Sequence, residues 1–519
     1  MSNGEKKQAR VIGGVMLITL ASKLLGLLRD RLLAVTFGTG MYANAFLTAS
    51  RIPRVFFDTL FASAIAASFI PVFTEALEKK GREQADRFAG NFITVMGLLT
   101  LLMTAAGIIL ADPLVTLFAQ GYDTETASLC ADLTRIMFPT IFFTGVAYAF
   151  VGLLQSFDEF NIPALISVVS NLVIIAYYPL LNERFGIYGL AVAFLVGWSL
   201  QALIQIPSLR KKGFRYRPSL KLKTEEMKKV FTLMLPVMVS TWVQPVMLTV
   251  NSRFASFLGG GSGVSQIEYS TNLYLMIIGV FILSVTNVIF PKLSRLEASS
   301  EKEAFQETVR GTMHASLFFV LPMMAGVMAL SYGLIDLVYG GGEFVGEDIT
   351  VTAAALLWMS PGMIGYAVQN ILSRVYFARQ DGRTPLLAGA VAIAADIVLC
   401  KLLIGPFGVA GLALASAAAG TVNAIILMIP LERRKEGFLS VPFLLDLLKM
   451  TAAAAVMGIL VYFCAAALAP LAGGIAGKLL VLAVPAAAGV IVFFVLAKLL
   501  RLQEADMAFD IVLRRSRSE

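Results

Sequence analysis

Long apolar stretches constrain this sequence more than any other feature. Crossing the hydrocarbon core of a bilayer takes a helix of about 20 mostly apolar residues, and such a helix satisfies its own backbone hydrogen bonds. The chain is 58% hydrophobic and 15% charged, which is far from the composition of soluble proteins. We therefore predict an all-α, multi-pass membrane protein with 14 transmembrane helices. The predicted helices lie near 10–37, 41–74, 88–111, 127–155, 160–182, 187–209, 228–257, 264–292, 304–332, 348–378, 384–404, 408–430, 444–469 and 475–500.

The distribution of positive charge predicts the orientation. Loops after even-numbered helices and both terminal segments carry about 30 of the 42 Lys and Arg residues, whereas the opposite loops carry Arg184, Lys401 and Lys478. Because positive residues stay on the cytoplasmic side, we expect both termini in the cytoplasm, and the net charge of +8 needs no nucleic acid to explain it. The first ten residues are interpreted as a cytoplasmic tail and not as a signal peptide. The basic run 210–223 is expected to link two halves or, alternatively, to contact anionic lipid headgroups.

The chain repeats itself at an offset of 222 residues. GIYGLAVAF, which starts at Gly186, matches GVAGLALAS, which starts at Gly408, and Pro163 and Pro385 share the same offset. The offset relates predicted helices 1–6 to predicted helices 7–12. Because each half has an even number of helices, the two halves have the same orientation and are related by a pseudo-twofold axis along the membrane normal. The predicted domains are an N-lobe at 1–209 with helices 1–6, a basic linker at 210–229, a C-lobe at 230–435 with helices 7–12, and helices 13 and 14 with a cytoplasmic tail at 436–519.

Several enzyme classes are excluded by what the sequence lacks. His314 is the single histidine, which rules out His-based triads and His-rich metal sites within this chain. No GxxxxGK[ST] motif occurs, and Cys130, Cys400 and Cys464 are isolated, which argues against a P-loop ATPase and a disulfide framework. We expect a transporter without catalytic residues, cofactor or metal site, with Na⁺ or H⁺ as the candidate coupling ion.

Ionisable residues within the first two predicted helices carry most of the functional information. Each costs about 2.5–3.5 kcal/mol at mid-helix, so such residues usually face a cavity or a partner. Five cations against two acids leave an excess of positive charge. This excess predicts a cavity for an anion such as pyrophosphate, because the arginine fork binds phosphate oxygens and lysine adds a point charge. The residues are Lys23, Arg29, Asp30 and Arg31 in the first helix, and Arg51, Arg54 and Asp58 in the second.

These cations are expected at two shared depths. At a rise of about 1.5 Å per residue, Arg29 and Arg51 lie about 12 and 15 Å below the outer ends of their helices. Lys23 and Arg54 both lie about 20 Å below those ends. Pro53 should kink the second helix between its arginines, because it removes a backbone donor. The alternative is pairing within the cluster, in which the aspartates neutralise two of the cations.

The second half is less charged, and its polar positions allow two interpretations each. Arg253 could bind substrate or pair with Glu268 near the outer interface, and Asn272 could bind substrate or join helices. Asp396, in the middle of predicted helix 11, is the candidate site for a sodium ion or proton, or it pairs with a cation on a neighbouring helix. His314, near the cytoplasmic end of predicted helix 9, is expected to pack and not to relay protons.

Three regions resemble the MurJ (MviN) lipid II flippases of the MOP exporter superfamily. They are SKLLGLLRDRLLAVTFGTGMYANAFLTASRIPRVFF in helices 1–2, VNSRFASFLGGGSGVSQIEYSTNLYLMIIGVF through VIFPKLS in helices 7–8, and SRVYFARQDGRTPLL with GPFGVAGLALASA in helices 10–12. The resemblance covers nearly the whole chain. It implies that an undecaprenyl-pyrophosphate-linked peptidoglycan precursor moves from the inner to the outer leaflet of the bacterial cytoplasmic membrane. It further implies alternating access of two lobes around a cationic cavity, and a groove for the lipid tail on helices 13 and 14.

The family's cation motif in helices 1 and 2 carries over in part. Arg29 and Asp30 match the family, whereas Lys23 stands where the family usually has arginine. Asn44 stands where an aspartate is common, and Phe57 stands where an arginine is common.

The second half of the chain also departs from the family pattern. Asn272 and Leu275 replace a frequent Arg and Glu pair in helix 8. Asp396 resembles the acidic ligand of a sodium site that some members have between helices 7, 11 and 12, but Ala392 lacks the expected amide. The predicted substrate-binding residues are Lys23, Arg29, Asp30, Asn44, Arg51, Arg54, Arg253 and Asn272, with Asp396 as the coupling-ion candidate.

Three other functions compete with the lipid II flippase. A flippase for another polyprenyl-linked oligosaccharide would use the same pyrophosphate contacts. A multidrug or cation antiporter of the same superfamily should have acidic groups in its cavity, and the excess of cations argues against it. A membrane glycosyltransferase would need catalytic carboxylates in aqueous loops, and the outer loops are short. The expected partners are lipid II or a related lipid-linked glycan and membrane lipids, and we expect a monomer.

Overall fold

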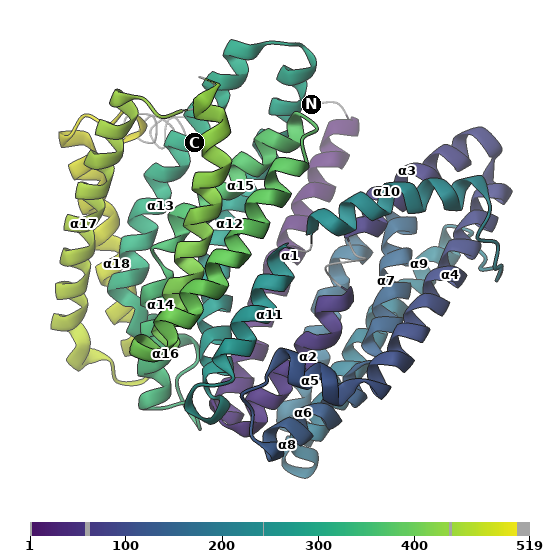
Figure 1. The fold of residues 1–519 in the computed structure, drawn as a ribbon, viewed down its shortest axis with the longest axis horizontal. Coiled ribbons are helices and arrows are strands. Elements are labelled where there is room, and N and C mark those ends of the chain that lie inside the picture. Colours follow the sequence, from purple (N-terminus) through teal and green to yellow (C-terminus); the bar gives the residue numbers. More distant parts are fainter. Residues whose placement is uncertain (1–2, 58–62, 242, 435–437, 506–519) are drawn as a thin grey trace. The chain divides into compact units, whose positions relative to one another are not determined.

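The computed structural model shows an all-helical protein (Figure 1). Within the residues it describes, eight helices are long and apolar enough to cross a membrane, or nine if the bent pair α14 (Glu347–Met359) and α15 (Gly362–Ala378) forms one span. The prediction of an all-α, multi-pass membrane protein is thereby confirmed. The described residues are 3–57, 63–241, 243–434 and 438–505.

The chain divides into two compact units, Met1–Ser265 and Gln266–Glu519. The helices of the first unit are α1 (Asn3–Phe37), α2 (Met41–Phe57), α3 (Ser63–Lys80), α4 (Arg82–Ile109), α5 (Ala111–Phe118), α6 (Thr124–Met137), α7 (Thr140–Gln155), α8 (Asn161–Leu203), α9 (Ile206–Lys211), α10 (Glu225–Thr241) and α11 (Val243–Ala255). The second unit contains most of α12 (Gly263–Ala298), followed by α13 (Lys302–Val338), α14, α15, α16 (Arg383–Arg433), α17 (Val441–Leu468) and α18 (Gly474–Leu499).

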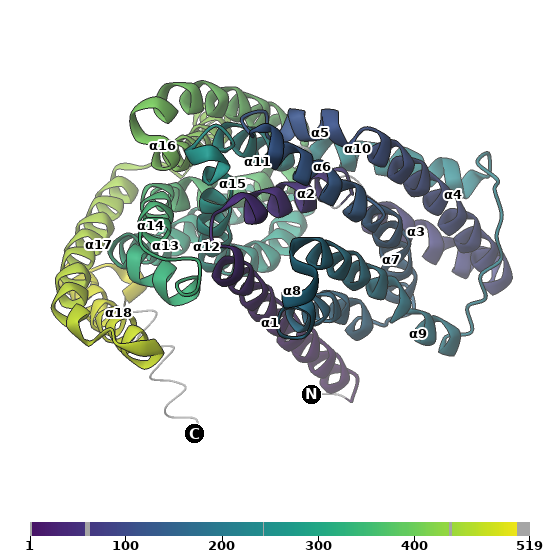
Figure 2. The same ribbon diagram turned by 90° about the horizontal axis from the view of Figure 1, so that it is seen from below.

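In the first unit, α1 packs along α8, and α2 packs on α6 (Figures 1 and 2). A cluster of phenylalanines fills the core where α3 meets α4. The ring of Phe69 stacks on Phe92 with centroids 4.6 Å apart, and on Phe73 with centroids 5.6 Å apart. Offset-stacked aromatic pairs add stability beyond the apolar area that they bury, so this cluster fixes the α3–α4 hairpin.

Helix α10 also packs on α3, although most of its residues fall in the predicted C-lobe at 230–435. Lys80 at the end of α3 donates a hydrogen bond of 2.6 Å to Glu226 of α10. Lys229 of α10 pairs with Glu75 of α3, and Lys79 pairs with the same carboxylate at 3.0 Å. Hydrogen bonds from Lys229 and Lys79 lower the pKa of Glu75 to about 2, and the bond from Lys229 has the larger effect. Helix α10 is thus attached to the first unit at its polar end.

In the second unit, α13 lies centrally and packs against α14, α15, α17 and α18. Two polar contacts hold the α17–α18 hairpin on α13 at opposite ends. Lys478 of α18 donates a hydrogen bond of 2.7 Å to Asp336 of α13. At the other end, His314 of α13 contacts Glu504 and lies 3.6 Å from Asp446 of α17. The last two helices therefore form part of the second unit.

Two glycines interrupt the long helices α8 and α16 in the same way. Gly186 has φ 51° and ψ −141°, and Gly408 has φ 55° and ψ −131°. Positive φ values are readily adopted by glycine because it has no Cβ atom. Each long helix therefore consists of two apolar segments, which agree with predicted helices 5 and 6 and predicted helices 11 and 12.

Other helix boundaries also recur at the offset of 222 residues. Helix α2 begins at Met41 and α12 begins at Gly263. The gap between α6 and α7 contains Pro139, and the gap between α14 and α15 contains Pro361. Proline lacks a backbone N–H and so weakens a helix at these points. The sequence predicted one helix across each gap, at 127–155 and 348–378. Thr124–Gln155 still qualifies as a single span across its gap, whereas α14 and α15 are bent by 48° at theirs.

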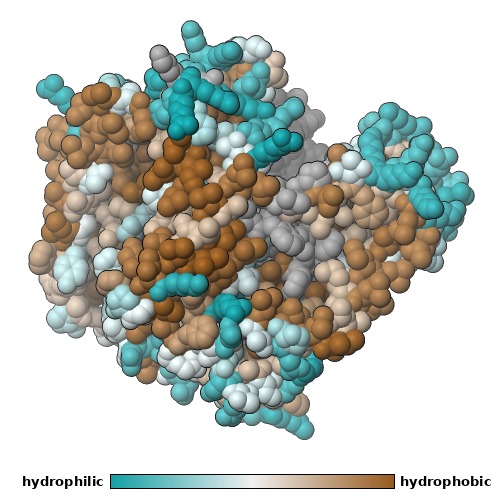
Figure 3. All heavy atoms as spheres, viewed as in Figure 1, coloured by the Kyte–Doolittle hydropathy of each residue, from teal (hydrophilic) through white to brown (hydrophobic). Residues whose placement is uncertain are grey.

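Exposed apolar side chains cover the lateral surface of the helices. Leu102 of α4 is 69% exposed, Val288 of α12 is 78% exposed and Leu499 of α18 is 72% exposed. Figure 3 shows apolar side chains over the length of α4, and polar side chains where the ends of α3, α4 and α10 meet. Soluble monomers rarely expose apolar patches of this extent. This surface is suited to contact with the hydrocarbon of a bilayer.

Candidate functional site

Arg29 lies on α1 where this helix packs against α8. Its Nε and Nη2 atoms donate hydrogen bonds of 3.0 and 2.8 Å to the Oδ1 atom of Asp30. Its Nη1 atom donates a hydrogen bond of 3.2 Å to the Oδ1 atom of Asn171 on α8. The Asn171 amide in turn donates to the carbonyl of Ser22 at 3.2 Å. The guanidinium is therefore oriented by two partners that lie on different helices.

The Arg29–Asp30 pair lies at the edge of the protein interior. The side chains are 24% and 14% exposed, respectively. The sequence also allowed the alternative that aspartates neutralise some of the cations. Arg29 and Asp30 form such a pair, because Asp30 neutralises the charge of Arg29. Asn171 was not among the predicted site residues, although an amide within the apolar segment SVVSNLVII is a signal that could have identified it.

On α2, Arg51 and Arg54 are separated by one helical turn and share a face. Arg51 is half-buried, Arg54 is exposed, and their positive charges lie close enough to interact. Arg51 also lies within electrostatic range of the Tyr122 hydroxyl. That hydroxyl shares a hydrogen bond of 2.7 Å with Thr48 and donates to the carbonyl of Asn44 at 3.0 Å. That Arg51 and Arg54 bind an anion stays a prediction.

The described contacts join Arg29 to Asp30 on α1 and bring Arg51 close to Arg54 on α2. Lys23 is exposed on α1. Asp58, the second acid considered for neutralisation, lies outside the described residues. That these cations converge on one ligand stays a prediction.

Asn44 is 1% exposed and makes contacts with the backbone. Its Nδ2 atom donates to the carbonyls of Thr39 and Gly40 at 2.6 and 2.8 Å. Its Oδ1 atom accepts a hydrogen bond of 2.9 Å from the backbone N–H of Ser265. These contacts give Asn44 a structural role at the start of α2, and its contact with substrate stays a prediction.

Arg253 and Asn272 occupy different environments. Arg253 of α11 donates a hydrogen bond of 3.1 Å to the carbonyl of Leu117 and also contacts the side chain of Gln120. A cation is favourable there, because Leu117 lies at the C-terminal end of α5, where the helix dipole is negative. Asn272 is half-buried on α12.

Asp396 is fully buried in α16. The thiol of Cys400, one turn later, lies 3.7 Å from its Oδ1 atom. Ala392, one turn earlier, is also fully buried. Among the described residues, no group of three or more His, Cys, Asp or Glu side chains could hold a metal ion. The coupling role of Asp396 stays a prediction.

Long apolar helices define a multi-pass membrane protein, and arginines and a buried acid within such helices are typical of transporters. The family model for the lipid II flippase MurJ matches residues 33–482. The probable lipid II flippase MurJ of Thermotoga maritima is 30% identical, over 94% of this chain and 96% of its own. The probable lipid II flippase MurJ of Vibrio cholerae is 30% identical, over 80% and 81% of the two chains. This chain belongs to the lipid II flippase MurJ family, as its sequence motifs predicted.

Solved structures agree with this assignment. A lipid II flippase MurJ in an inward closed conformation has a TM-score of 0.77 and 25% identity, and the match covers 93% of this chain and 98% of that chain. An inward-facing multidrug resistance MATE family transporter of the MOP superfamily has a TM-score of 0.68 and 16% identity, with coverage of 81% and 97%. The second structure shows a shared fold. Family membership places the protein among transporters and not among enzymes.

Proposed function

We propose that this protein moves lipid II from the inner to the outer leaflet of the bacterial cytoplasmic membrane. The observation that carries this proposal is the match to the MurJ family over residues 33–482, together with relatives named as lipid II flippases over up to 94% of the chain. Moving a lipid across a bilayer breaks no covalent bond, so the protein needs binding groups and a conformational change but no catalytic residues.

Two lobes that alternate in access would supply this conformational change. We propose 14 transmembrane helices, with six in each lobe, two more at the C-terminal end and both termini in the cytoplasm. The matching conformations of Gly186 and Gly408 support the internal repeat, as do the helix breaks at Pro139 and Pro361. Parallel repeats of this kind rock against each other in several transporter families.

A cationic cavity would bind the pyrophosphate of the substrate. Arg51 and Arg54 lie one turn apart on one face of α2, and both could make charge-assisted contacts to phosphate oxygens. Asp30 and Asn171 orient the guanidinium of Arg29, which limits the side-chain entropy that it would lose on binding. Lys23 would add a point charge from the same helix as Arg29.

The pyrophosphate contacts do not identify the sugar. A flippase for another polyprenyl-linked oligosaccharide would use the same cations, and this is the nearest alternative. A MATE-like cation antiporter shares the fold, but a fold alone does not define a substrate. The excess of arginine and lysine in helices α1 and α2 favours an anionic substrate over a cationic drug.

Coupling and assembly complete the proposal. Na⁺ or H⁺ would be the coupling ion, with the buried carboxylate of Asp396 as its site. The protein would act as a monomer surrounded by membrane lipids.

Complementation tests the proposal. Expression in cells depleted of their own lipid II flippase should restore growth and normal cell shape. Failure to restore growth, with the protein present in the membrane in normal amount, would contradict lipid II as the substrate. Rescue of a strain that lacks a flippase for a different lipid-linked oligosaccharide, without rescue of the first strain, would favour the nearest alternative.

A further inference from the structure

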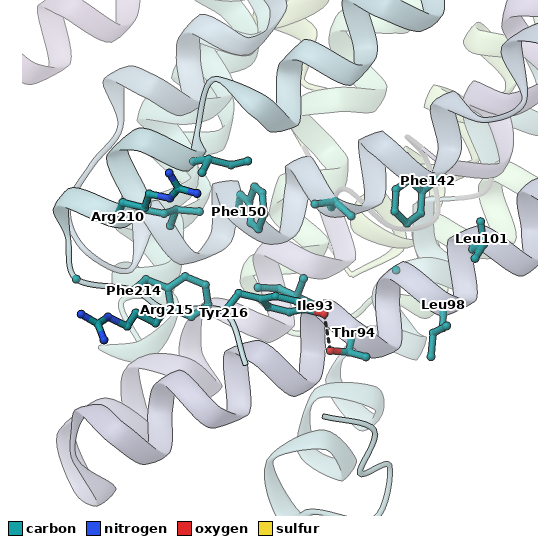
Figure 4. Close-up of a pocket in the computed structure, with 15 residues that line it drawn as sticks. Ile93, Thr94, Leu98, Leu101, Phe142, Phe150, Arg210, Phe214, Arg215 and Tyr216 are labelled. Atoms are coloured by element: carbon teal, nitrogen blue, oxygen red, sulfur yellow. Dashed lines mark hydrogen bonds between the residues drawn. The ribbon is translucent and has the colours of Figure 1, made fainter. Parts of the chain in front are cut away.

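A groove of about 1000 Å³ lies in the first unit between α4 and α7 (Figure 4). Helix α9 and the segment that follows it close one end. The groove is apart from the cations of α1 and α2. Its lining comes from α4, α7, α9 and the segment after α9, and it includes Gly97, Leu101, Phe142, Arg210, Arg215 and Tyr216.

The two ends of the groove differ in chemistry. Figure 4 shows Arg210 and Arg215 at one end, and Phe142, Leu98 and Leu101 toward the other. Leu98 and Leu101 are 42% and 51% exposed, so this part of the groove opens to the lateral, apolar surface of α4. The basic end belongs to the linker that the charge pattern places in the cytoplasm. A polar end at the membrane surface and an apolar end within the membrane match the two parts of a phospholipid.

The segment that forms the basic end is held against α4 by hydrogen bonds and close packing. The hydroxyl of Tyr216 shares a hydrogen bond of 2.9 Å with Thr94 of α4. Asn91 and Lys221 exchange two hydrogen bonds, from the Asn91 amide to the Lys221 carbonyl at 2.8 Å and from the Lys221 N–H to the Asn91 side chain at 2.7 Å. A Cβ atom at Gly90 would lie 2.4 Å from the carbonyl oxygen of Arg217, so glycine permits this close approach. These contacts fix the linker along α4.

Arg210 and Arg215 differ from the other basic groups around this end of the groove. Arg82 pairs with Asp86 at 3.0 Å, and Arg87 pairs with Glu83 at 2.8 Å. Arg210 and Arg215 are exposed, and neither forms an ion pair with a carboxylate in the part of the chain that the structure describes. Two such cations beside an apolar groove complement a phosphate that carries an acyl chain.

We propose that this groove binds one anionic phospholipid. Its phosphate would lie between Arg210 and Arg215, and one acyl chain would run past Gly97 toward Leu101 and Phe142. Tyr216 would lie at the headgroup level, where aromatic side chains with a polar tip are favoured. The bound lipid would join the linker to α4 and α7 and so stabilise the first unit. This site does not depend on the proposed transport of lipid II.

Retention of lipid by the purified protein tests this proposal. The full-length protein is exchanged into detergent with equal amounts of phosphatidylglycerol and phosphatidylcholine, and bound lipid is counted by native mass spectrometry. The wild type should retain one phosphatidylglycerol in preference to phosphatidylcholine. The double variant Arg210→Gln/Arg215→Gln should lower this retention by about tenfold or more. The matched control Lys211→Gln/Lys223→Gln removes the same charge from exposed linker positions outside the groove and should retain lipid like the wild type.

A second variant tests the apolar end. Gly97→Leu places a side chain inside the groove while both arginines remain, and it should also lower retention of phosphatidylglycerol. Thermal unfolding in lipid-free detergent shows that each variant folds, and added phosphatidylglycerol should raise the melting temperature of the wild type and the control only. Equal loss of lipid in the lysine control would show general attraction to the basic linker and overturn the proposal. Normal retention by Gly97→Leu, or equal retention of phosphatidylcholine by the wild type, would also overturn it.

Discussion

Gly186 and Gly408 are 222 residues apart and share one backbone conformation, with φ of 51° and 55° and ψ of −141° and −131°. Three residues after each, a second glycine is tightly enclosed. A Cβ atom at Gly189 would lie 2.3 Å from the Tyr177 hydroxyl, and one at Gly411 would lie 2.2 Å from a backbone carbonyl oxygen. We call the turn at each of these interruptions of α8 and α16 a hairpin. Both hairpins therefore require glycine twice, which supports two structurally equivalent halves.

Substituting either hairpin glycine should destabilise the protein. Gly186→Ala and Gly408→Ala place a Cβ atom at a positive φ, which should cost about 1–3 kcal/mol each. Gly420→Ala in α16 is the control, because its φ is not positive and the space around it is open. Thermal unfolding in detergent should show lower melting temperatures for the first two variants only. Equal melting temperatures for all three would show that the hairpin conformation is not required.

Asn171 should act on transport through Arg29. Asn171→Ala removes an acceptor from the guanidinium and the contact between α8 and Ser22 of α1. A hydrogen bond to a charged group is worth about 1.5–3 kcal/mol, so flipping should fall about tenfold or more while membrane abundance is retained. The double variant Asn171→Ala/Arg29→Ala should flip no more slowly than Arg29→Ala alone, because both changes act on one group. Additive losses would show that Asn171 acts independently of Arg29.

Asp396 should determine the ion dependence of transport. Its carboxyl group is fully buried beside Cys400 in an apolar part of α16. Asp396→Asn keeps the shape of the side chain and removes its charge, so it should weaken any Na⁺ or H⁺ dependence of flipping. Unchanged ion dependence in Asp396→Asn, together with normal flipping, would show that the carboxylate is structural.

The linker should be accessible only from the cytoplasm. Leu220 is 60% exposed, and Leu220→Cys in a background without Cys464 provides a single accessible thiol, because Cys130 and Cys400 are buried. A membrane-impermeant thiol reagent should label it after the cells are permeabilised and not before. Labelling in intact cells would reverse the proposed orientation and the depths assigned to Arg29 and Arg51.

The apolar spans were predictable because their length and composition suit the bilayer and nothing else. Their breaks were not. Pro139 and Pro361 each lie in a gap between two helices, whereas α2 continues as a helix through Pro53. Proline removes one donor in every case, and the packing around it decides whether the helix continues or ends. The attachment of α10 to α3 was also not predictable, because it depends on ion pairs between distant segments such as Lys80 and Glu226.

Part of the candidate site was also predictable from the sequence, and part was not. Charge within an apolar helix identified Arg29 and Asp30, and the structure places these adjacent residues in one ion pair. Asn171 was missed because it lies 142 residues away along the chain, and periodicity says nothing about such contacts. Asn44 was selected by its position in the family motif, and Arg253 was selected by its charge. In the structure both side chains donate hydrogen bonds to backbone carbonyls, and neither criterion reveals such contacts.

The rate of lipid II flipping by Arg29→Ala, compared with wild type at equal membrane abundance, tests the central claim most directly. Loss of one charge-assisted contact should weaken binding by roughly ten- to a hundredfold, so Arg29→Ala should flip lipid II more slowly by a similar factor and should abolish complementation. Arg29→Lys should restore flipping in part, because it keeps the charge and loses the fork, and Arg31→Ala should have a milder effect. Normal flipping by Arg29→Ala would contradict the anion site, and reduced membrane abundance alone would show that Arg29 and Asp30 form a structural ion pair.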